Sequence, residues 1–137
     1  MAIHPYLIFS GNCREAFTRY HEILGGDLRV MPMSEAPPEA RMPDVPDDLV
    51  MHAALTFGDD LLMASDDPTG DGGPAKGMAV SLEVADPDEA RRVFDALADG
   101  GEVTMPLEKT FWSPLFGMCN DRFGIPWMIS VEEPDEG

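Results

Sequence analysis

The chain has 137 residues, 44% of them hydrophobic, which is the size and composition of a globular domain with its own core. Its 26 acidic and 9 basic residues give a formal net charge of −17. This charge disfavours nucleic acid and anionic membrane surfaces as partners, keeps the protein soluble and would attract a cationic small molecule. Two widely separated cysteines and the lack of an apolar run of about 20 residues indicate a reduced, cytoplasmic protein without a membrane span.

The first half of the chain begins with a predicted strand, helix and strand. Residues 6–9 (YLIF) are β-prone, and the apolar residues that follow have the period of a helix, at positions 16, 17, 20, 23 and 24. Asn12, with Glu15 three residues later, has the form of a capping box. Gly25-Gly26 would end this helix and turn the chain into the next strand.

A hairpin and two irregular segments complete this half. Residues 50–57 and 60–65 are predicted to pair through the turn Gly58-Asp59. Residues 34–48 are rich in proline and acid and predict a long loop. The glycine-rich residues 67–77 predict a flexible linker, because no Gly-Lys-Ser/Thr follows to complete a phosphate loop.

The second half repeats the same order. A strand at 80–84 precedes Asp86 as N-cap, Pro87 at the first helical position and Glu89 as the capping-box partner. The apolar stripe of this helix lies at 90, 93, 94, 97 and 98, and Gly100-Gly101 follows. Residues 111–120 and 125–131 predict a second hairpin around DRFG, in which Asp121 is typical of a turn-closing aspartate.

These two halves indicate an internal duplication. Residues 6–32 align with 81–106, and Glu15-Ala16 matches Glu89-Ala90. The sequence therefore predicts two β-α-β-β-β modules: module one is 1–66, the linker is 67–77 and module two is 78–137.

This pattern resembles the vicinal oxygen chelate superfamily, which contains glyoxalase, bleomycin-resistance and extradiol dioxygenase proteins. The segments PYLIFSGNCREA, MHAAL and FW…FG…DRFGIPWMI resemble its PhnB-like branch, also labelled 3-demethylubiquinone-9 3-methyltransferase. The resemblance covers nearly the whole chain and implies an α+β fold, with both modules forming a curved mixed-sheet half-barrel around a cavity and commonly a homodimer. No methyl-donor signature is present, and no cofactor is predicted.

The resemblance also implies positions for a divalent metal, which related proteins hold with His or Glu from four strands. Here these positions are assigned to Pro5, Val80 or Ala79, Met63 and Met128. Such side chains are poor ligands for a hard cation, so no metal site is predicted. A one-residue shift of register would instead bring His4 near His52, which leaves a histidine-based metal site as the alternative.

His52 is the candidate general acid or base. In VMHAALTF, Met51, Ala53, Leu55 and Phe57 alternate with His52, Ala54 and Thr56. If the second face lines the cavity, His52 can transfer protons near neutral pH. A hydrogen-bonded histidine on a partly wet strand is the alternative.

Aromatic residues gather in the last third of the chain. Trp112 and Phe116 flank Pro114 in the irregular segment TFWSPLFG, and aromatic walls are typical of small-molecule cavities. The predicted ligand-binding residues are Trp112, Phe116, Met63, Phe9, Met128 and Trp127. Core packing is the alternative for most of them.

Cys13 and His21 look like a nucleophile and its base. Cys13 takes the first helical position, where the helix dipole is expected to lower its pKa. His21 follows eight residues later, about 12 Å along the helix axis, which is too far for a nucleophile–base hydrogen bond. The helix at 13–24 is therefore predicted to be scaffold.

Two functions of different classes follow. The first is a metal-independent binding protein that sequesters a small, preferably cationic molecule in an apolar aromatic cavity, as the resemblance to bleomycin-resistance proteins implies. The second is a lyase or dioxygenase-type enzyme that uses His52, with a metal held in a non-standard way. Met63 and Met128, in place of carboxylates, favour the first.

Overall fold

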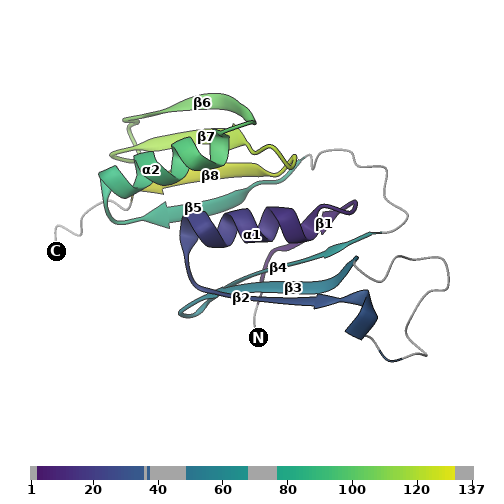
Figure 1. The fold of residues 1–137 in the computed structure, drawn as a ribbon. Helices are drawn as coiled ribbons and strands as arrows, with labels where there is room; N and C mark the ends of the chain where they lie inside the picture. The colour runs from purple at the N-terminus through teal and green to yellow at the C-terminus, as the bar shows by residue number, and fades with distance from the viewer. Residues whose placement is uncertain (1–2, 36, 38–48, 68–76, 132–137) are drawn as a thin grey trace. The chain divides into compact units, whose positions relative to one another are not determined.

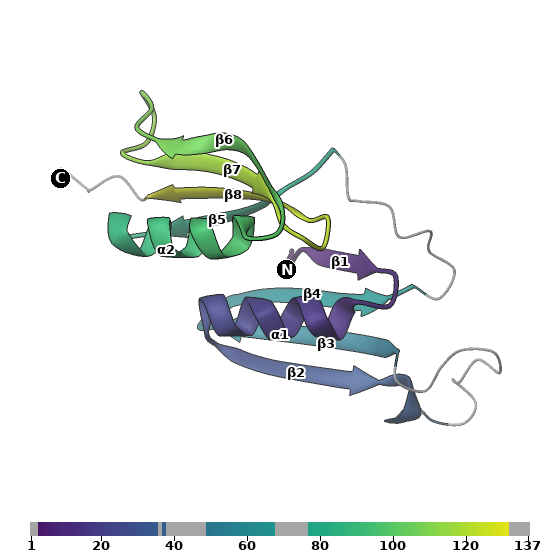
Figure 2. The ribbon, with the colours of Figure 1, turned by 45° about the horizontal axis from the view of Figure 1, so that its top comes forward.

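The computed structural model describes residues 3–35, 37, 49–67 and 77–131. The chain divides into two compact units, Met1–Gly73 and Pro74–Gly137. Each unit has one helix packed on a four-stranded sheet, so the α+β prediction with two β-α-β-β-β repeats is confirmed (Figures 1 and 2). Joining the two sheets into a half-barrel stays a prediction. Most of the predicted loop at 34–48, most of the linker and residues 132–137 lie outside the described residues.

The first unit places its first strand beside its last. Its elements are β1 (Tyr6–Phe9), α1 (Cys13–Leu24), β2 (Asp27–Pro32), the 3-10 helix η1 (Met33–Glu35), β3 (Val50–Phe57) and β4 (Asp60–Asp66). The strand order is β1-β4-β3-β2, with β1 parallel to β4 and the other pairs antiparallel. The predicted hairpin of β3 and β4 is confirmed, and η1 occupies the start of the predicted loop.

The second unit has the same topology. Its elements are β5 (Val80–Val84), α2 (Pro87–Ala98), β6 (Glu102–Glu108), β7 (Phe116–Asn120) and β8 (Pro126–Val131), in the order β5-β8-β7-β6. The strand predicted at 111–120 begins only at Phe116. The preceding residues instead form a turn in which Thr110 N donates to Ser113 O, and Ser113 N donates to Thr110 Oγ1 at 3.1 Å.

Each helix packs its apolar stripe against one face of its own sheet. The buried residues of α1 include Ala16, Phe17, Tyr20 and Ile23, and those of α2 are Ala90, Val93, Phe94 and Leu97. Burying each of the larger side chains contributes about 1.5–3 kcal/mol. Contact between α2 and β7 requires Gly117, because an added Cβ would lie 2.9 Å from Cε2 of Phe94. The opposite face of each sheet, here called the open face, is not covered by the helix of its own unit.

The helix starts differ between the two units. At α2, Asp86 Oδ1 accepts from Asp88 N at 3.2 Å, as predicted. At α1 the predicted cap is wrong, since Asn12 makes no side-chain capping bond. Asp66 replaces it, because its buried carboxylate is held at the end of β4 and is a stronger acceptor than an amide.

Asp66 links the helix start to the sheet. Its Oδ1 accepts from Gly11 N at 2.9 Å and Cys13 N at 3.0 Å, and its Oδ2 accepts from Val50 N at 3.0 Å. One carboxylate therefore ties β4, the start of α1 and the start of β3 together.

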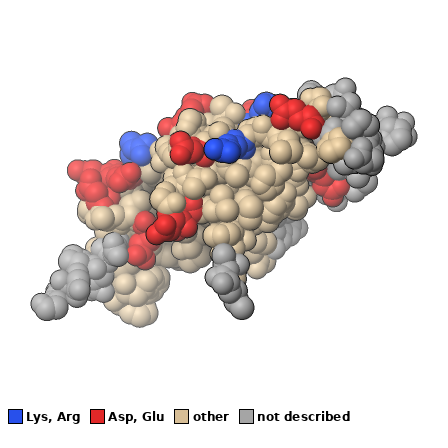
Figure 3. Space-filling view, turned by 90° about the horizontal axis from the view of Figure 1, so that it is seen from below, with Lys and Arg blue, Asp and Glu red and all other residues tan. Residues whose placement is uncertain are grey.

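The surface carries the acidic excess of the composition. On the face shown in Figure 3, Asp and Glu side chains are more prominent than Lys and Arg. Within the part of the chain that the structure describes, no helix has the length and apolar character needed to cross a membrane.

Candidate functional site

The open face of the first sheet carries aromatic, thioether and imidazole groups. Tyr6 pairs with Met63 on β4, and Met63 pairs with Ala54 on β3. Ile8 pairs with Ser65 in the next row. Tyr6 and Ile8 are exposed, while their neighbours Leu7 and Phe9 are buried under α1. This face therefore presents apolar side chains that its own helix does not cover.

His52 lies on this open face and contacts Tyr6. The Tyr6 hydroxyl lies 3.3 Å from His52 Nδ1, and the two ring centroids are 5.9 Å apart. His52 is half-buried and is paired across the strands with Met31. Sequence reasoning missed Tyr6, although the alternation of YLIF places Tyr6 opposite the core residues Leu7 and Phe9.

Two of the predicted ligand-binding residues lie on the helix-facing side of their sheets. Phe9 packs edge-on against Phe17 of α1, with ring centroids 6.2 Å apart. Trp127 is only 1% exposed, and its Nε1 donates to Asp121 Oδ2 at 2.9 Å. Both residues are core, and the structure does not bring them to the open faces with Met63 and Met128.

The strand registers correct the predicted metal positions. Tyr6, rather than Pro5, lies beside Met63, and Ser81, rather than Val80 or Ala79, lies beside Met128. A phenol, a hydroxyl and two thioethers do not fit a hard divalent cation. Among the described residues no group of three or more His, Cys, Asp or Glu could hold a metal ion. His4 is half-buried and precedes β1.

The open face of the second sheet carries a row of three methionines, here called the thioether row. Met128 on β8 pairs with Met118 on β7, which pairs with Met105 on β6. Met105 is 40% exposed and the other two are half-buried. Cys119 and Trp127, their neighbours in sequence, face the helix and are buried.

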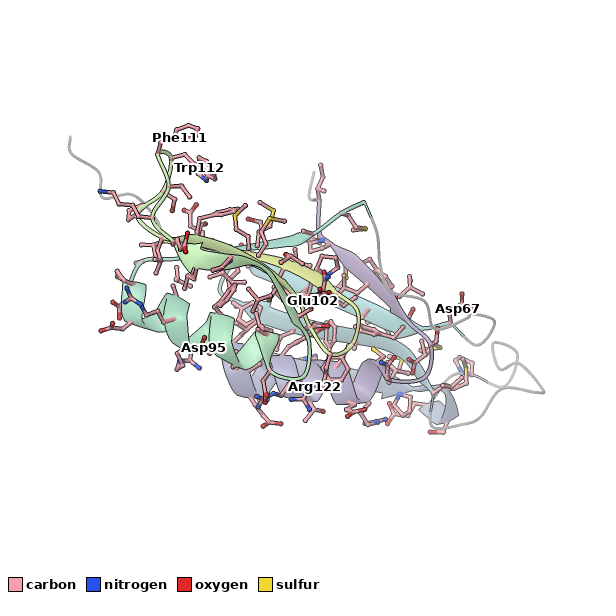
Figure 4. The ribbon with its side chains drawn as sticks, turned by 90° about the horizontal axis from the view of Figure 1, so that it is seen from above. Asp67, Asp95, Glu102, Phe111, Trp112 and Arg122 are labelled. Carbon is pink, nitrogen blue, oxygen red and sulfur yellow. The ribbon has the colours of Figure 1, made fainter. Side chains whose placement is uncertain are left out.

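An aromatic turn lies beside the thioether row. Trp112 is 51% exposed and contacts Phe116 edge-on, with centroids 5.4 Å apart. Phe111 is 96% exposed and stacks edge-on against Trp112 at 4.6 Å. Figure 4 shows Phe111 and Trp112 on the side of the second sheet that faces away from α2. The Thr110–Ser113 hydrogen bonds hold this turn, and therefore Trp112, in place.

Carboxylates surround the apolar centre of this open face. Glu108 pairs with Phe116, and Glu83 pairs with Ser130 in the same row. Glu102 pairs with Asn120 at the other end of β7. All three glutamates are exposed. The face thus combines aromatic and thioether groups with a negative rim, which suits a cation with apolar surface.

Neither cysteine has the properties of a nucleophile. Burial, followed by the charge of Asp66, raises the pKa of Cys13 to about 12, so the predicted lowering by the helix dipole is wrong. Burial and the charge of Asp121 raise the pKa of Cys119 to about 11. His21 contacts the Gly26 carbonyl oxygen through Nε2 at 3.1 Å, at the end of α1.

Asp121 closes the turn between β7 and β8. Its Oδ1 accepts from the backbone N–H groups of Phe123 and Ile125, both at 2.9 Å, and its Oδ2 holds the Trp127 indole. The predicted turn role is confirmed. Arg122 pairs with Asp99 at 3.6 Å on the partly exposed surface, where such pairs contribute little.

Comparison with known proteins agrees with this architecture. The model of the glyoxalase/bleomycin resistance protein/dioxygenase superfamily matches residues 2–129. Protein YjdN of Escherichia coli strain K12 is 35% identical over 141 residues, covering 96% of this chain and 95% of its own length.

Two solved structures extend the comparison. Protein PA1353 from Pseudomonas aeruginosa superposes with a TM-score of 0.88 at 48% identity, covering 98% of this chain and 99% of that one. The putative 3-demethylubiquinone-9 3-methyltransferase, PhnB protein, from Bacillus cereus has a TM-score of 0.76 at 25% identity, over 96% of this chain and all of that one. With its two β-α-β-β-β units, this chain therefore belongs to the glyoxalase/bleomycin resistance protein/dioxygenase superfamily.

Proposed function

We propose that this chain is a metal-independent binding protein that holds a small, cationic, aromatic molecule on the apolar open face of its second sheet. Trp112 and Phe116 would supply the aromatic contacts, and Met128 would supply the adjoining thioether. The glutamates at 83 and 108 would balance the charge of the ligand. Met63 lies beside Tyr6 on the open face of the first sheet, and its contact with a ligand stays a prediction.

Metal independence is supported by the side chains at the two strand positions where metal-binding relatives are expected to have carboxylates. Met63 lies beside Tyr6, and Met128 lies beside Ser81. These donors do not fit a hard divalent ion, so no step of the proposed function passes through one.

The observation that favours a cationic aromatic ligand is the exposed Trp112 ring, which packs edge-on against the buried Phe116. A planar cation stacked on Trp112 gains cation–π attraction of about 0.5–2 kcal/mol. Glu108, paired with Phe116 across the strands, adds a carboxylate beside the ring. The net charge of −17 would raise the rate at which a cation arrives.

Binding can be tested with acridines that share one ring size and differ in charge. We expect the cationic members to raise the melting temperature and to quench tryptophan fluorescence, while neutral and anionic members do neither. Trp112→Leu should weaken binding by about tenfold, and Phe111→Leu should weaken it less, because Phe111 is 96% exposed and supports the site through its edge-on contact with Trp112. Both residues are exposed, so neither change should disturb folding.

Metal dependence is tested in the same titration. Dialysis against EDTA should leave the affinity for the acridine unchanged. Loss of binding after EDTA, restored by Mn²⁺, Ni²⁺ or Zn²⁺, would contradict the proposal. Equal binding by cationic and anionic acridines would contradict the charge argument alone.

An enzyme of the glyoxalase or dioxygenase type is the second candidate, and the Tyr6–His52 contact favours it. When the tyrosine donates its O–H to Nδ1, the neutral imidazole carries its proton on Nε2, which fixes one tautomer for proton transfer. Turnover of a hemithioacetal or a catechol that is lost in His52→Gln and reduced in Tyr6→Phe would support this candidate. Turnover that survives His52→Gln would exclude His52 as the acid or base.

We also propose that the protein is a homodimer, as expected from the family resemblance. Light scattering after size-exclusion chromatography should give twice the mass of 15.0 kDa. A monomeric mass over the micromolar range would contradict this.

A further inference from the structure

We propose that the thioether row of Met105, Met118 and Met128 binds one soft monovalent metal ion, Cu(I) or its analogue Ag(I). The inference does not rest on the proposed function, because it concerns a different ligand and uses only the three thioether sulfurs.

The register brings the three sulfurs within reach of one ion. Met118 is the direct cross-strand partner of both Met128 and Met105, so the three residues form one line over three adjacent strands. Side chains paired in this way have Cβ atoms about 5 Å apart. Methionine has three rotatable bonds, so the two outer side chains can lean over the central one. At bonds of about 2.3 Å, the length of a zinc–thiolate bond, sulfurs that share one ion lie within about 4.6 Å of one another, a spacing that these side chains can reach.

The chemistry of the row selects a soft ion. Thioethers favour Cu(I) over hard cations, which prefer carboxylate and water ligands. The remaining member of the line is Ser81, on the far side of Met128, and a hydroxyl adds no competing charge. The thiol of Cys119 lies on the opposite face, where burial raises its pKa to about 11 and keeps it protonated.

Core packing does not account for the row. Met105 is 40% exposed, whereas the core side of the same strands holds Cys119, Trp127 and Ile129, all buried. The first sheet offers a natural contrast, because Met63 has only Tyr6 and Ala54 beside it. The first unit thus carries two open-face thioethers, Met31 and Met63, which are not cross-strand partners, and the second unit carries three aligned ones.

The test uses the full chain labelled with ¹³C at the methionine methyl groups and titrated with silver nitrate in chloride-free buffer. Silver is diamagnetic and does not change oxidation state, so each methyl signal can be followed. Of the ten methionines, we expect three to shift together and to saturate at one equivalent of Ag(I). Single Met→Leu variants assign those three signals to positions 105, 118 and 128.

The variants decide whether the row acts as one site. Met118→Leu removes the central sulfur and should weaken Ag(I) binding roughly 10- to 100-fold, the range seen when a metal site loses a supporting group. Met63→Leu is the matched control and should leave Ag(I) affinity unchanged. Competition between Cu(I) and bicinchoninate under nitrogen should rank the variants in the same order.

Three results would overturn the inference. The methyl signals of the row could stay in place while Ag(I) binds, which would assign the metal to the thiols. The three signals could saturate at different silver concentrations, which would mean independent weak sites. Met118→Leu and Met63→Leu could also have equal effects, and the row would then have no special role.

Discussion

Replacing Asp66 with alanine is expected to destabilise the first unit by about 4 kcal/mol, because three backbone donors lose their acceptor at once. Two of them belong to Cys13 and Val50, which are buried, and the third belongs to Gly11 at a partly exposed position. The mutation therefore removes the side-chain acceptor of two buried N–H groups at once.

The magnitude follows from the number of buried donors. Each unsatisfied buried N–H costs about 1–3 kcal/mol, so two give about 2–6 kcal/mol. A whole domain is stable by about 5–15 kcal/mol, so the loss is a large part of the total. Asp66→Asn keeps one oxygen for Gly11 and Cys13 but turns an amide N–H toward Val50 N, and should cost about 1–3 kcal/mol. Asp60→Asn, at the exposed start of β4, removes the same charge and should cost less than about 0.5 kcal/mol.

The assay can separate the two units, because both tryptophans, Trp112 and Trp127, lie in the second one and both tyrosines, Tyr6 and Tyr20, lie in the first. Urea unfolding followed by far-UV circular dichroism reports both units, and fluorescence excited at 295 nm reports the second. We expect Asp66→Ala to lower the midpoint of the dichroism transition more than the midpoint of the fluorescence transition.

The reasoning fails if Asp66→Ala and Asp60→Asn unfold at the same urea concentration. It also fails if Asp66→Asn is as damaging as Asp66→Ala, because the amide keeps two of the three bonds. Either result would mean that water replaces the carboxylate at little cost.

Three further changes have defined outcomes. Burial raises the pKa values of Cys13 and Cys119 to about 12 and 11 from an ordinary 9.0, so these thiols ionise at lower pH in the unfolded chain than in the folded one. The free energy of unfolding should therefore fall as pH rises from about 9. Between about pH 8 and 10.5, the urea midpoint of Cys119→Ala should fall less than that of the unchanged protein. Gly117→Ala places a Cβ 2.9 Å from the backbone of β6 and should cost about 1–3 kcal/mol, measured by tryptophan fluorescence in urea; an unchanged midpoint would contradict the packing. Asp86→Ala should cost about 1 kcal/mol and Asn12→Ala only a few tenths, because only Asp86 makes a side-chain cap; equal losses by circular dichroism would contradict this.

The order of elements could be predicted because each has a strong local pattern. The apolar residues at 90, 93, 94 and 97 have the helical period, and all four are buried on the side of α2 that packs against the sheet. Asp86 caps the start of that helix by accepting from Asp88 N, and Pro87 takes the first helical position. Such signals need no knowledge of the rest of the chain.

Contacts between distant residues could not be predicted in this way. The acceptor at the start of α1 comes from Asp66, far along the chain, so a local capping rule chose Asn12 instead. Burial raises the pKa of Cys13 and the same carboxylate adds to this rise, against the expected effect of the helix dipole. In both cases the tertiary environment overrides a local preference.

Strand alternation in the sequence was sufficient to predict which side chains share a face of the sheet. Trp127 and Met128 are adjacent on one strand and must point to opposite sides of the sheet, so they cannot both contact a ligand on one face. The structure resolves the choice, with Trp127 in the core and Met128 on the open face. Tyr6 follows from the same alternation once Phe9 is assigned to the core.

The parallel pairing of first and last strands also governs how each unit can form during synthesis. Tyr6 on β1 pairs with Met63 on β4, and Val80 on β5 pairs with Trp127 on β8, while β1 and β5 have no second partner among the described strands. During synthesis, β1 and β5 leave the ribosome first in their units. Each stays unpaired until the last strand of its unit has also left the exit tunnel. Each repeat is completed from its C-terminal end, so a nascent chain that stalls before β8 would carry a finished first unit and an unclosed second one.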